Sequence, residues 1–296
     1  MIATRIYKKI KLFLLMNNYN TFPNYFKNVD EINLSPIFII GGNRSGTSLI
    51  SSLISQHHQV EGIFENSEFP KLSKYGKHVL AYCTSHHVWN FLVKMKSNWT
   101  HQDEGVLWGH PKNISKYYID KPRNAKQSLI LANAIQFFRK TEKTPLLNSH
   151  YNMFRVGMIK KIFPNAKFIL IIKDYNEIIT SCYDKWEKQK INIEYPKIGL
   201  HWFTTNSCCL YDLKKYASAD YCVIEFAELF NKEEKTIKML NNKLENIGLD
   251  KFSYDLDIIK PEHRFIESKN SKQFNFEKYF GWIENIIDDE SKITNT

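Results

Sequence analysis

The feature that most constrains the fold is a strand, a glycine-rich loop and a helix that follow one another directly. Residues 36–40 read Pro-Ile-Phe-Ile-Ile, an apolar run of strand length. The loop Gly-Gly-Asn-Arg-Ser-Gly-Thr-Ser follows at 41–48, and apolar residues then recur at helical spacing over 49–54. Such a loop lets backbone amides converge on an anion, toward which the helix presents its positive end. The segment predicts an α/β protein with an anion site at this loop.

A second unit of the same kind is predicted further along the chain. Asn148 and Ser149 can cap a helix through Val156, Ile159 and Ile162, Pro164 ends it, and Lys167 to Ile172 reads as a buried strand. Asp174 is a candidate cap for the next helix, with Glu177 three residues on. Strands that alternate with helices favour a parallel sheet covered on both faces.

The rest of the chain is assigned to the same single domain, residues 1–296. A short strand over 221–224 and a helix that stops at Gly248 complete the alternation, which predicts a three-layer α/β sheet. Residues 66–144 are polar and irregular, and we interpret them as a mostly helical insertion that shapes an acceptor site. Residues 1–35 form a basic N-terminal segment.

Charge and composition exclude some classes of protein. No apolar run reaches the roughly 18 residues of a membrane-spanning helix. The net charge of +10 suits an anionic ligand or a membrane surface, and scattered aromatics disfavour nucleic acid. Five cysteines without C-x-x-C spacing indicate reduced thiols. We expect a cytoplasmic protein, with peripheral contact at the inner membrane face as an addition if the basic N-terminal segment binds lipid.

The loop lacks one residue of a nucleoside triphosphatase. Thr47 stands where the G-x-x-x-x-G-K-[ST] phosphate loop needs its lysine, and Arg44 lies inside the loop instead. A triphosphatase or kinase would therefore miss the group that reaches the β- and γ-phosphates.

Two stretches carry a resemblance to the sulfotransferase family, whose donor is 3′-phosphoadenosine 5′-phosphosulfate (PAPS). Residues 38–49 resemble the family's 5′-phosphosulfate loop. Residues 163–174, Phe-Pro-Asn-Ala-Lys-Phe-Ile-Leu-Ile-Ile-Lys-Asp, are similar to its FP-x-A-K-x-I-x-x-x-R-D strand, and 223–229 to its V-x-Y-E-D-L segment, from which Phe226 and Ala227 depart. The resemblance implies a P-loop NTPase-like sulfotransferase fold, closer to the carbohydrate and tyrosylprotein branch.

The resemblance also implies the donor site. The candidates for the 5′-phosphosulfate are Arg44, Ser45, Gly46, Thr47 and Ser48, and Arg44 would also offset charge on the leaving phosphate.

The family's 3′-phosphate pair corresponds to Lys173 and Ser181, which are eight residues apart. Lys173 ends a strand at the edge where open α/β sheets bind ligands. It replaces an arginine, which keeps the charge and loses the bidentate fork, and Tyr175 replaces the family's proline.

For the general base the sequence offers Glu65 first, with Glu68, Glu61 or a histidine as alternatives. Glu65 follows the first helix about where carbohydrate and tyrosylprotein sulfotransferases place a catalytic glutamate. The family's K-x-P lysine has no counterpart after Leu147, and His150, Arg155 and Lys112 are possible substitutes.

The expected reaction transfers a sulfuryl group to a hydroxyl, with a saccharide or glycolipid acceptor favoured and 3′-phosphoadenosine 5′-phosphate (PAP) as product. No metal is expected, because the histidines of the 66–144 segment lack ligand spacing. The alternatives are a P-loop kinase and a non-catalytic nucleotide-binding scaffold. The sequence leaves the acceptor and the oligomeric state open.

Overall fold

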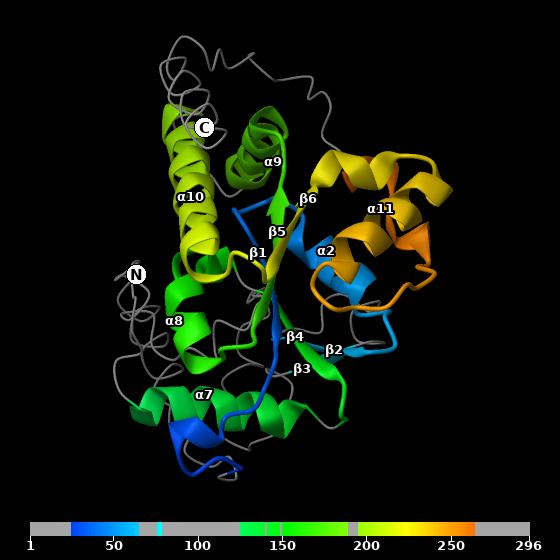
Figure 1. Cartoon of the computed structure of the whole chain (residues 1–296). Coiled ribbons are helices and arrows are strands. Elements are labelled where there is room, and N and C mark those ends of the chain that lie inside the picture. The colour runs from blue at the N-terminus through cyan, green and yellow to red at the C-terminus, as the bar shows by residue number, and fades with distance from the viewer. Residues whose placement is uncertain are drawn as a thin grey trace, which may run out of the picture.

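The structure is a computed structural model that describes residues 25–64, 76–78, 125–139, 141–148, 150–188 and 195–263. Its centre is a parallel sheet, and every neighbouring pair of strands in it runs in the same direction (Figure 1). The strands lie in the order β3 (Gly76–His78), β2 (Val60–Phe64), β4 (Thr144–Asn148), β1 (Ile37–Gly41), β5 (Lys167–Ile172), β6 (Tyr221–Glu225).

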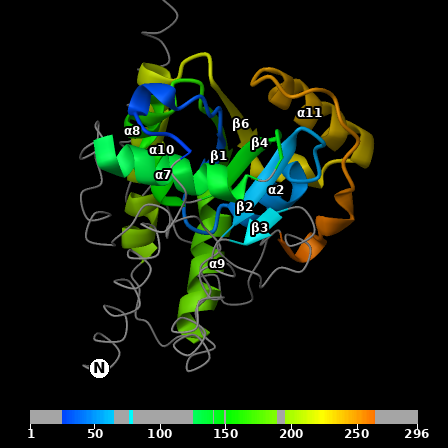
Figure 2. The ribbon, with the colours of Figure 1, turned by 90° about the horizontal axis from the view of Figure 1, so that it is seen from below.

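Helices cover both faces of this sheet, as the view from below in Figure 2 shows. One face carries α2 (Thr47–Ile54) and α11 (Glu233–Glu245). The other carries α7 (Ala125–Phe138), α8 (Val156–Ile162) and α10 (Tyr195–Tyr216), and α9 (Tyr175–Lys188) packs beside the start of α10. Short 3-10 turns are η1 (Val29–Glu31), η3 (His150–Phe154), η4 (Phe226–Phe230), η5 (Leu256–Ile258) and η6 (Pro261–His263).

The three layers follow from the alternation of side chains along the strands. In β1, Phe38 and Ile40 pack toward α7, α8 and α10, whereas Ile37 and Ile39 pack toward α2 and α11. All four are buried, so the strand is apolar on both faces. That is why a continuous apolar run, rather than an alternating one, marks it in the sequence.

The structure confirms the predicted α/β class, the parallel sheet and most of the predicted elements. The strands at 36–40 and 167–172 and the helix ending before Gly248 are present, whereas the helix predicted to start at Asn148 or Ser149 begins only at Val156, after a 3-10 turn. Asp174 caps α9, since its carboxylate accepts the backbone N–H groups of Asn176 at 2.8 Å and Glu177 at 3.2 Å. Strands β2, β3 and β4 and the long helix α10 were not predicted.

The predicted insertion, residues 66–144, contributes to the main fold wherever it is described. β3 extends the sheet. Leu131, Ala132 and Ile135 of α7 are buried in the hydrophobic core on one face of the sheet. The role of this segment in shaping an acceptor site stays a prediction, because its other residues lie outside the described ones.

Part of the N-terminal segment is docked on α7. The Phe26 amide donates to Oδ1 of Asn133 at 2.8 Å, and Asn133 Nδ2 donates back to the Phe26 carbonyl at 3.2 Å. Residues 1–24 lie outside the described ones. Among the helices that the structure describes, none is long and apolar enough to span a bilayer.

Candidate functional site

The two predicted motifs meet at one edge of the sheet. β1 and β5 are neighbours in register, with Gly41 opposite Ile171, so the loop after β1 and Lys173 after β5 leave the sheet side by side. Because both strands are parallel, this is the edge where their carboxyl ends converge. We call it the carboxyl edge of the sheet.

The loop between β1 and α2 is held in a conformation that requires its glycines. Gly46 has φ +91°, and a Cβ there would lie 2.1 Å from the ring of Phe226. A Cβ on Gly41 would lie 2.5 Å from Ser45 Oγ and 3.0 Å from the Ile171 carbonyl oxygen. Arg44 is non-glycine yet has φ +67°, a left-handed conformation that costs energy for an L-residue. The loop is therefore a strained, closely packed turn.

The loop offers several groups to an anion. Ser45 is buried, and its Oγ has no hydrogen-bond partner among the described residues. Thr47 and Ser48 are half-buried in the first turn of α2, where backbone N–H groups point out of the helix. The Arg44 side chain is exposed. A cation, an unpartnered hydroxyl and a helix N-terminus together suit a phosphate or sulfate group.

A direct hydrogen bond joins the loop to the second motif. Arg44 Nε donates to Ser181 Oγ at 2.9 Å, across 137 positions of sequence. Ser181 lies on α9 and is buried. The sequence placed these two residues in one site from separate motifs, and the structure brings them into contact.

Lys173 lies beneath the same loop with its ammonium group enclosed. Its side chain is only 3% exposed, and Nζ lies 3.2 Å from Glu177 Oε2. Nζ also donates to the His263 carbonyl at 3.1 Å and stands 4.1 Å from the centre of the Phe226 ring. Phe226 is thus close to both Lys173 and Gly46, which places the lysine near the loop.

Several residues of this edge were not found from the sequence. On α10, Trp202 Nε1 donates to the Lys173 carbonyl at 3.1 Å, and Thr205 Oγ1 would be 3.9 Å from a Cβ on Gly42. Asn148 ends β4 beside β1, is 3% exposed, and its Oδ1 has no partner among the described residues. The strand at 144–148 contains a proline and is flanked by polar residues, so its hydrophobic pattern did not predict a strand.

The candidate bases are placed differently. Glu65 and Glu68 lie outside the described residues, as do Lys112 and the histidines from 86 to 110. Glu61 is described, and it is not near the loop. It pairs in register with Pro145 near the start of β4, and its carboxylate accepts from Thr141 Oγ1 at 2.8 Å. Glu61 therefore lies toward the amino edge of the sheet, and its role as an alternative base stays a prediction.

His57 is held by structural contacts. It is 1% exposed, one ring nitrogen lies 2.8 Å from the Asp250 carbonyl, and Nδ1 accepts from the Gln59 amide. Burial lowers the pKa of this imidazole, despite the opposing effect of the Asp250 hydrogen bond.

Of the K-x-P substitutes, Arg155 is described in full. It is buried at the start of α8, and its guanidinium lies 3.4 Å from Asn152 Oδ1. His150 begins η3, two residues after the last residue of β4.

Within the described ranges, no three His, Cys, Asp or Glu side chains form a group that could hold a metal ion. The four described cysteines, Cys182, Cys208, Cys209 and Cys222, are all free thiols. Burial raises the pKa of the Cys222 thiol to about 12, so it is protonated at neutral pH.

Comparison with known proteins identifies the family. The sequence model of the sulfotransferase family matches residues 36–248, which is more than half of the chain. No protein of curated function gave a match.

Solved sulfotransferases are similar in structure. One from Mycobacterium tuberculosis is 14% identical, with 82% of this chain and 77% of that chain covered and a TM-score of 0.49. One from Alicyclobacillus acidocaldarius is 15% identical, with 77% and 87% covered and a TM-score of 0.42. These TM-scores lie below 0.5, so the assignment rests on the match to the family's sequence model. The chain belongs to the sulfotransferase family.

Proposed function

We propose that this sulfotransferase takes its sulfuryl group from PAPS and binds that donor at the carboxyl edge of the sheet. The observation that carries the proposal is the 2.9 Å hydrogen bond from Arg44 to Ser181, which joins the loop to the α9 motif. A donor with phosphate groups at both ends of its ribose needs two anion sites a few ångströms apart. Arg44 with the loop supplies one, and Lys173 with Ser181 supplies the other.

The loop residues are assigned to the 5′-phosphosulfate. The Thr47 and Ser48 hydroxyls, the Ser45 Oγ and the N–H groups of the first turn of α2 donate to its oxygens. Arg44 offsets the charge that builds up on the leaving phosphate. Sulfuryl transfer needs positioning and charge stabilisation more than covalent help, and these fixed donors provide both.

The proton of the acceptor hydroxyl must go to a base, and we assign that role to Glu65. Strand β2 ends at Phe64, and β2 pairs with β4, whose last residue Asn148 is opposite Ile39 of β1. By this register, the chain leaves β2 at the same edge as the loop. Glu65 is the next residue, which supports it over Glu68.

For the acceptor we propose a saccharide or glycolipid hydroxyl. A glutamate soon after the phosphosulfate loop is the arrangement of the carbohydrate and tyrosylprotein enzymes. The basic residues between 1 and 17 suit contact with an anionic membrane surface, where a glycolipid would be found, and we propose a cytoplasmic location with that contact.

The donor site is tested by calorimetric titration of PAP into the protein and its Arg44→Ala and Lys173→Ala variants, with ATP as the competing ligand. We expect PAP to bind the wild type, to bind each variant about tenfold or more weakly, and to be preferred over ATP. Glu142→Gln, a charge change at the opposite edge of the sheet, is the matched control and should leave PAP affinity unchanged.

The rival functions give other results. A P-loop kinase would prefer ATP and hydrolyse it. A nucleotide-binding scaffold would bind PAP and transfer no sulfate from PAPS to any member of a panel of saccharide, glycolipid and phenolic acceptors. Either result would overturn the proposed reaction.

A further inference from the structure

The lysine assigned to the 3′-phosphate already has an anionic partner. Glu177 Oε2 lies 3.2 Å from Lys173 Nζ, and both side chains are enclosed, with 10% and 3% of their surfaces exposed. An ion pair in such surroundings is screened much less by water and salt than a surface pair.

The two residues are held so that the carboxylate faces the ammonium group. Lys173 follows β5 directly and Glu177 is in the first turn of α9, four residues on. The Glu177 amide donates to Asp174, which fixes the turn between them. The His263 carbonyl approaches the lysine from elsewhere in the chain, and Phe226 covers it beside the loop.

A phosphate group that binds Lys173 would therefore meet a second negative charge at the same ammonium. Either the carboxylate turns away, or both anions share one lysine at close range and repel each other. Both outcomes lower the affinity for a 3′-phosphate. Neither affects a nucleotide that lacks the 3′-phosphate.

We propose that Glu177 is a specificity-determining residue of the donor site, which competes with the 3′-phosphate for Lys173 and limits the preference for 3′-phosphorylated nucleotides. This inference rests on the proposed function, since it takes the donor site as assigned there. The preference of the site for PAP over adenosine 5′-monophosphate (AMP) is then set by the balance between Lys173 and Glu177.

The test is a calorimetric comparison of PAP and AMP, which differ only in the 3′-phosphate. Glu177→Gln keeps the shape of the side chain and removes its charge. We expect it to bind PAP about tenfold more tightly than the wild type does, with AMP affinity changed by less than about twofold. Glu142→Gln removes the same charge from the opposite edge and should change neither affinity.

A second variant covers a failure of the first to fold, which thermal unfolding would reveal. Glu177→Asp shortens the side chain by one methylene and lengthens the distance from the carboxylate to Lys173. It should raise the affinity for PAP by a smaller factor than Glu177→Gln does. Lys173→Ala should bind PAP and AMP with similar affinity, because the cation that distinguishes them is gone.

Three outcomes separate the inference from the proposed function. If the wild type binds PAP no better than AMP and Lys173→Ala changes neither, the donor site itself is wrong. If PAP binds through Lys173 but Glu177→Gln leaves it unchanged or weaker, the inference is overturned, and Glu177 instead holds the lysine in position. Equal tightening of PAP and AMP would also overturn it, since the effect would not involve the 3′-phosphate.

Discussion

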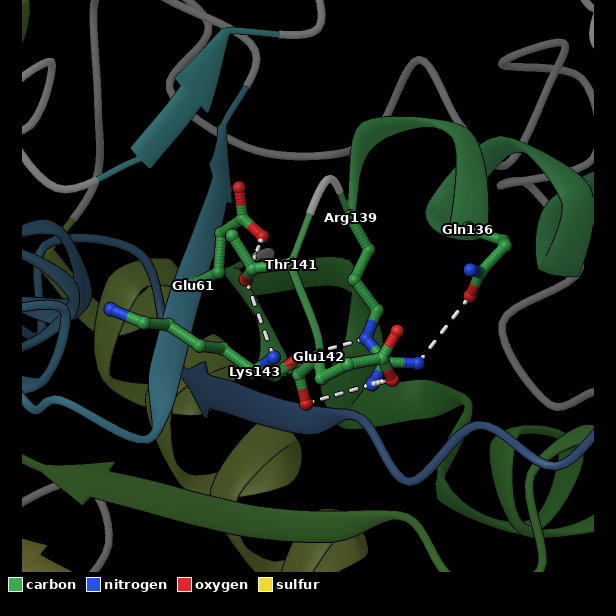
Figure 3. A network of polar contacts seen from close by, with 6 residues as sticks. All are labelled: Glu61, Gln136, Arg139, Thr141, Glu142 and Lys143. Atoms are coloured by element: carbon green, nitrogen blue, oxygen red, sulfur yellow. Dashed lines mark hydrogen bonds and ion pairs between the residues drawn. The ribbon is translucent and has the colours of Figure 1, made fainter.

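The two edges of the sheet handle their polar groups in opposite ways. At the amino edge, charges are paired within the protein. Figure 3 shows Thr141 donating to Glu61 at 2.8 Å, while Arg139 binds the Lys143 carbonyl at 2.8 Å and Glu142 at 3.2 Å. Buried or half-buried polar groups in this region have partners, which is the usual state of a folded protein.

At the carboxyl edge, polar groups are buried without partners among the described residues. Ser45 Oγ, Asn148 Oδ1 and Asn206 Oδ1 are in this state, and Arg44 has its strained backbone there. A fourth such atom, the Tyr254 hydroxyl, lies away from the loop beside His57. Unmet hydrogen-bonding capacity and strain both lower stability, and they gather where we propose that the donor binds. One sheet thus has an edge that stabilises it and an edge that is left ready for a ligand.

The largest expected effect is at the loop, where Gly46→Ala should lower the free energy of unfolding by about 3 kcal/mol. Its φ of +91° disfavours alanine, and the added Cβ meets the Phe226 ring at 2.1 Å. Gly248 is a matched control, because it has φ +86° and nothing within 4 Å of an added Cβ. Gly248→Ala should cost only the backbone share, about 1 kcal/mol.

Urea denaturation of both variants measures the difference. Equal losses would show that Phe226 yields to the added methyl, and the loop would then be less tightly packed than the geometry indicates.

The same contrast explains what could be predicted from the sequence. The loop and the 163–174 motif were readable because close packing around glycines and a fully apolar strand restrict residue choice. Asp174 was recognisable as a cap, since capping depends on local spacing. The elements that were missed, such as β2 and α10, owe their state to tertiary packing. Trp202 and Thr205 reach the site from a helix whose outer face mixes polar and aromatic residues, so no periodic pattern distinguished it.

The Lys173–Glu177 pair was beyond sequence reasoning for a related reason. From the sequence, Glu177 was expected in the first turn of a helix, where an acidic residue is favourable in any case. Only the structure shows that its carboxylate reaches the lysine four residues before it.

A smaller effect is expected at the amino edge, from Asp220→Asn. The Asp220 carboxylate lies 2.7 Å from Lys160 Nζ and 2.5 Å from Lys167 Nζ. Burial alone would raise the pKa of this carboxyl, but the two ammonium groups outweigh it and hold the pKa below its usual value. Because the folded-state pKa is depressed, the stabilisation is complete well above the unfolded value near 4 and disappears as the pH falls through the folded value.

At pH 7, Asp220→Asn should therefore lower the free energy of unfolding by about 1 kcal/mol, after allowance for solvent screening of a partly exposed group. The difference from wild type should shrink below about pH 5. Denaturation curves from pH 7 to pH 3 test this. A difference that stays constant over that range would mean that the carboxylate's charge contributes nothing.

The smallest effect on stability is expected from Asn148→Leu. The sign of the change in the free energy of unfolding distinguishes a buried amide without partners, as at the carboxyl edge, from one with partners, as at the amino edge. Asn148 is buried at the end of β4 with an Oδ1 that no described residue satisfies. Leucine has a similar volume and no polar atom, so the free energy of unfolding should stay within about 0.5 kcal/mol of wild type or rise by about 1 kcal/mol. If the buried amide had its hydrogen-bond partners, as polar groups at the amino edge do, the same change would lower the free energy of unfolding by about 1–3 kcal/mol. Chemical denaturation at neutral pH decides between them: a loss of that size would place Asn148 among the groups that stabilise the fold, whereas no loss would leave its amide available for a ligand at the carboxyl edge.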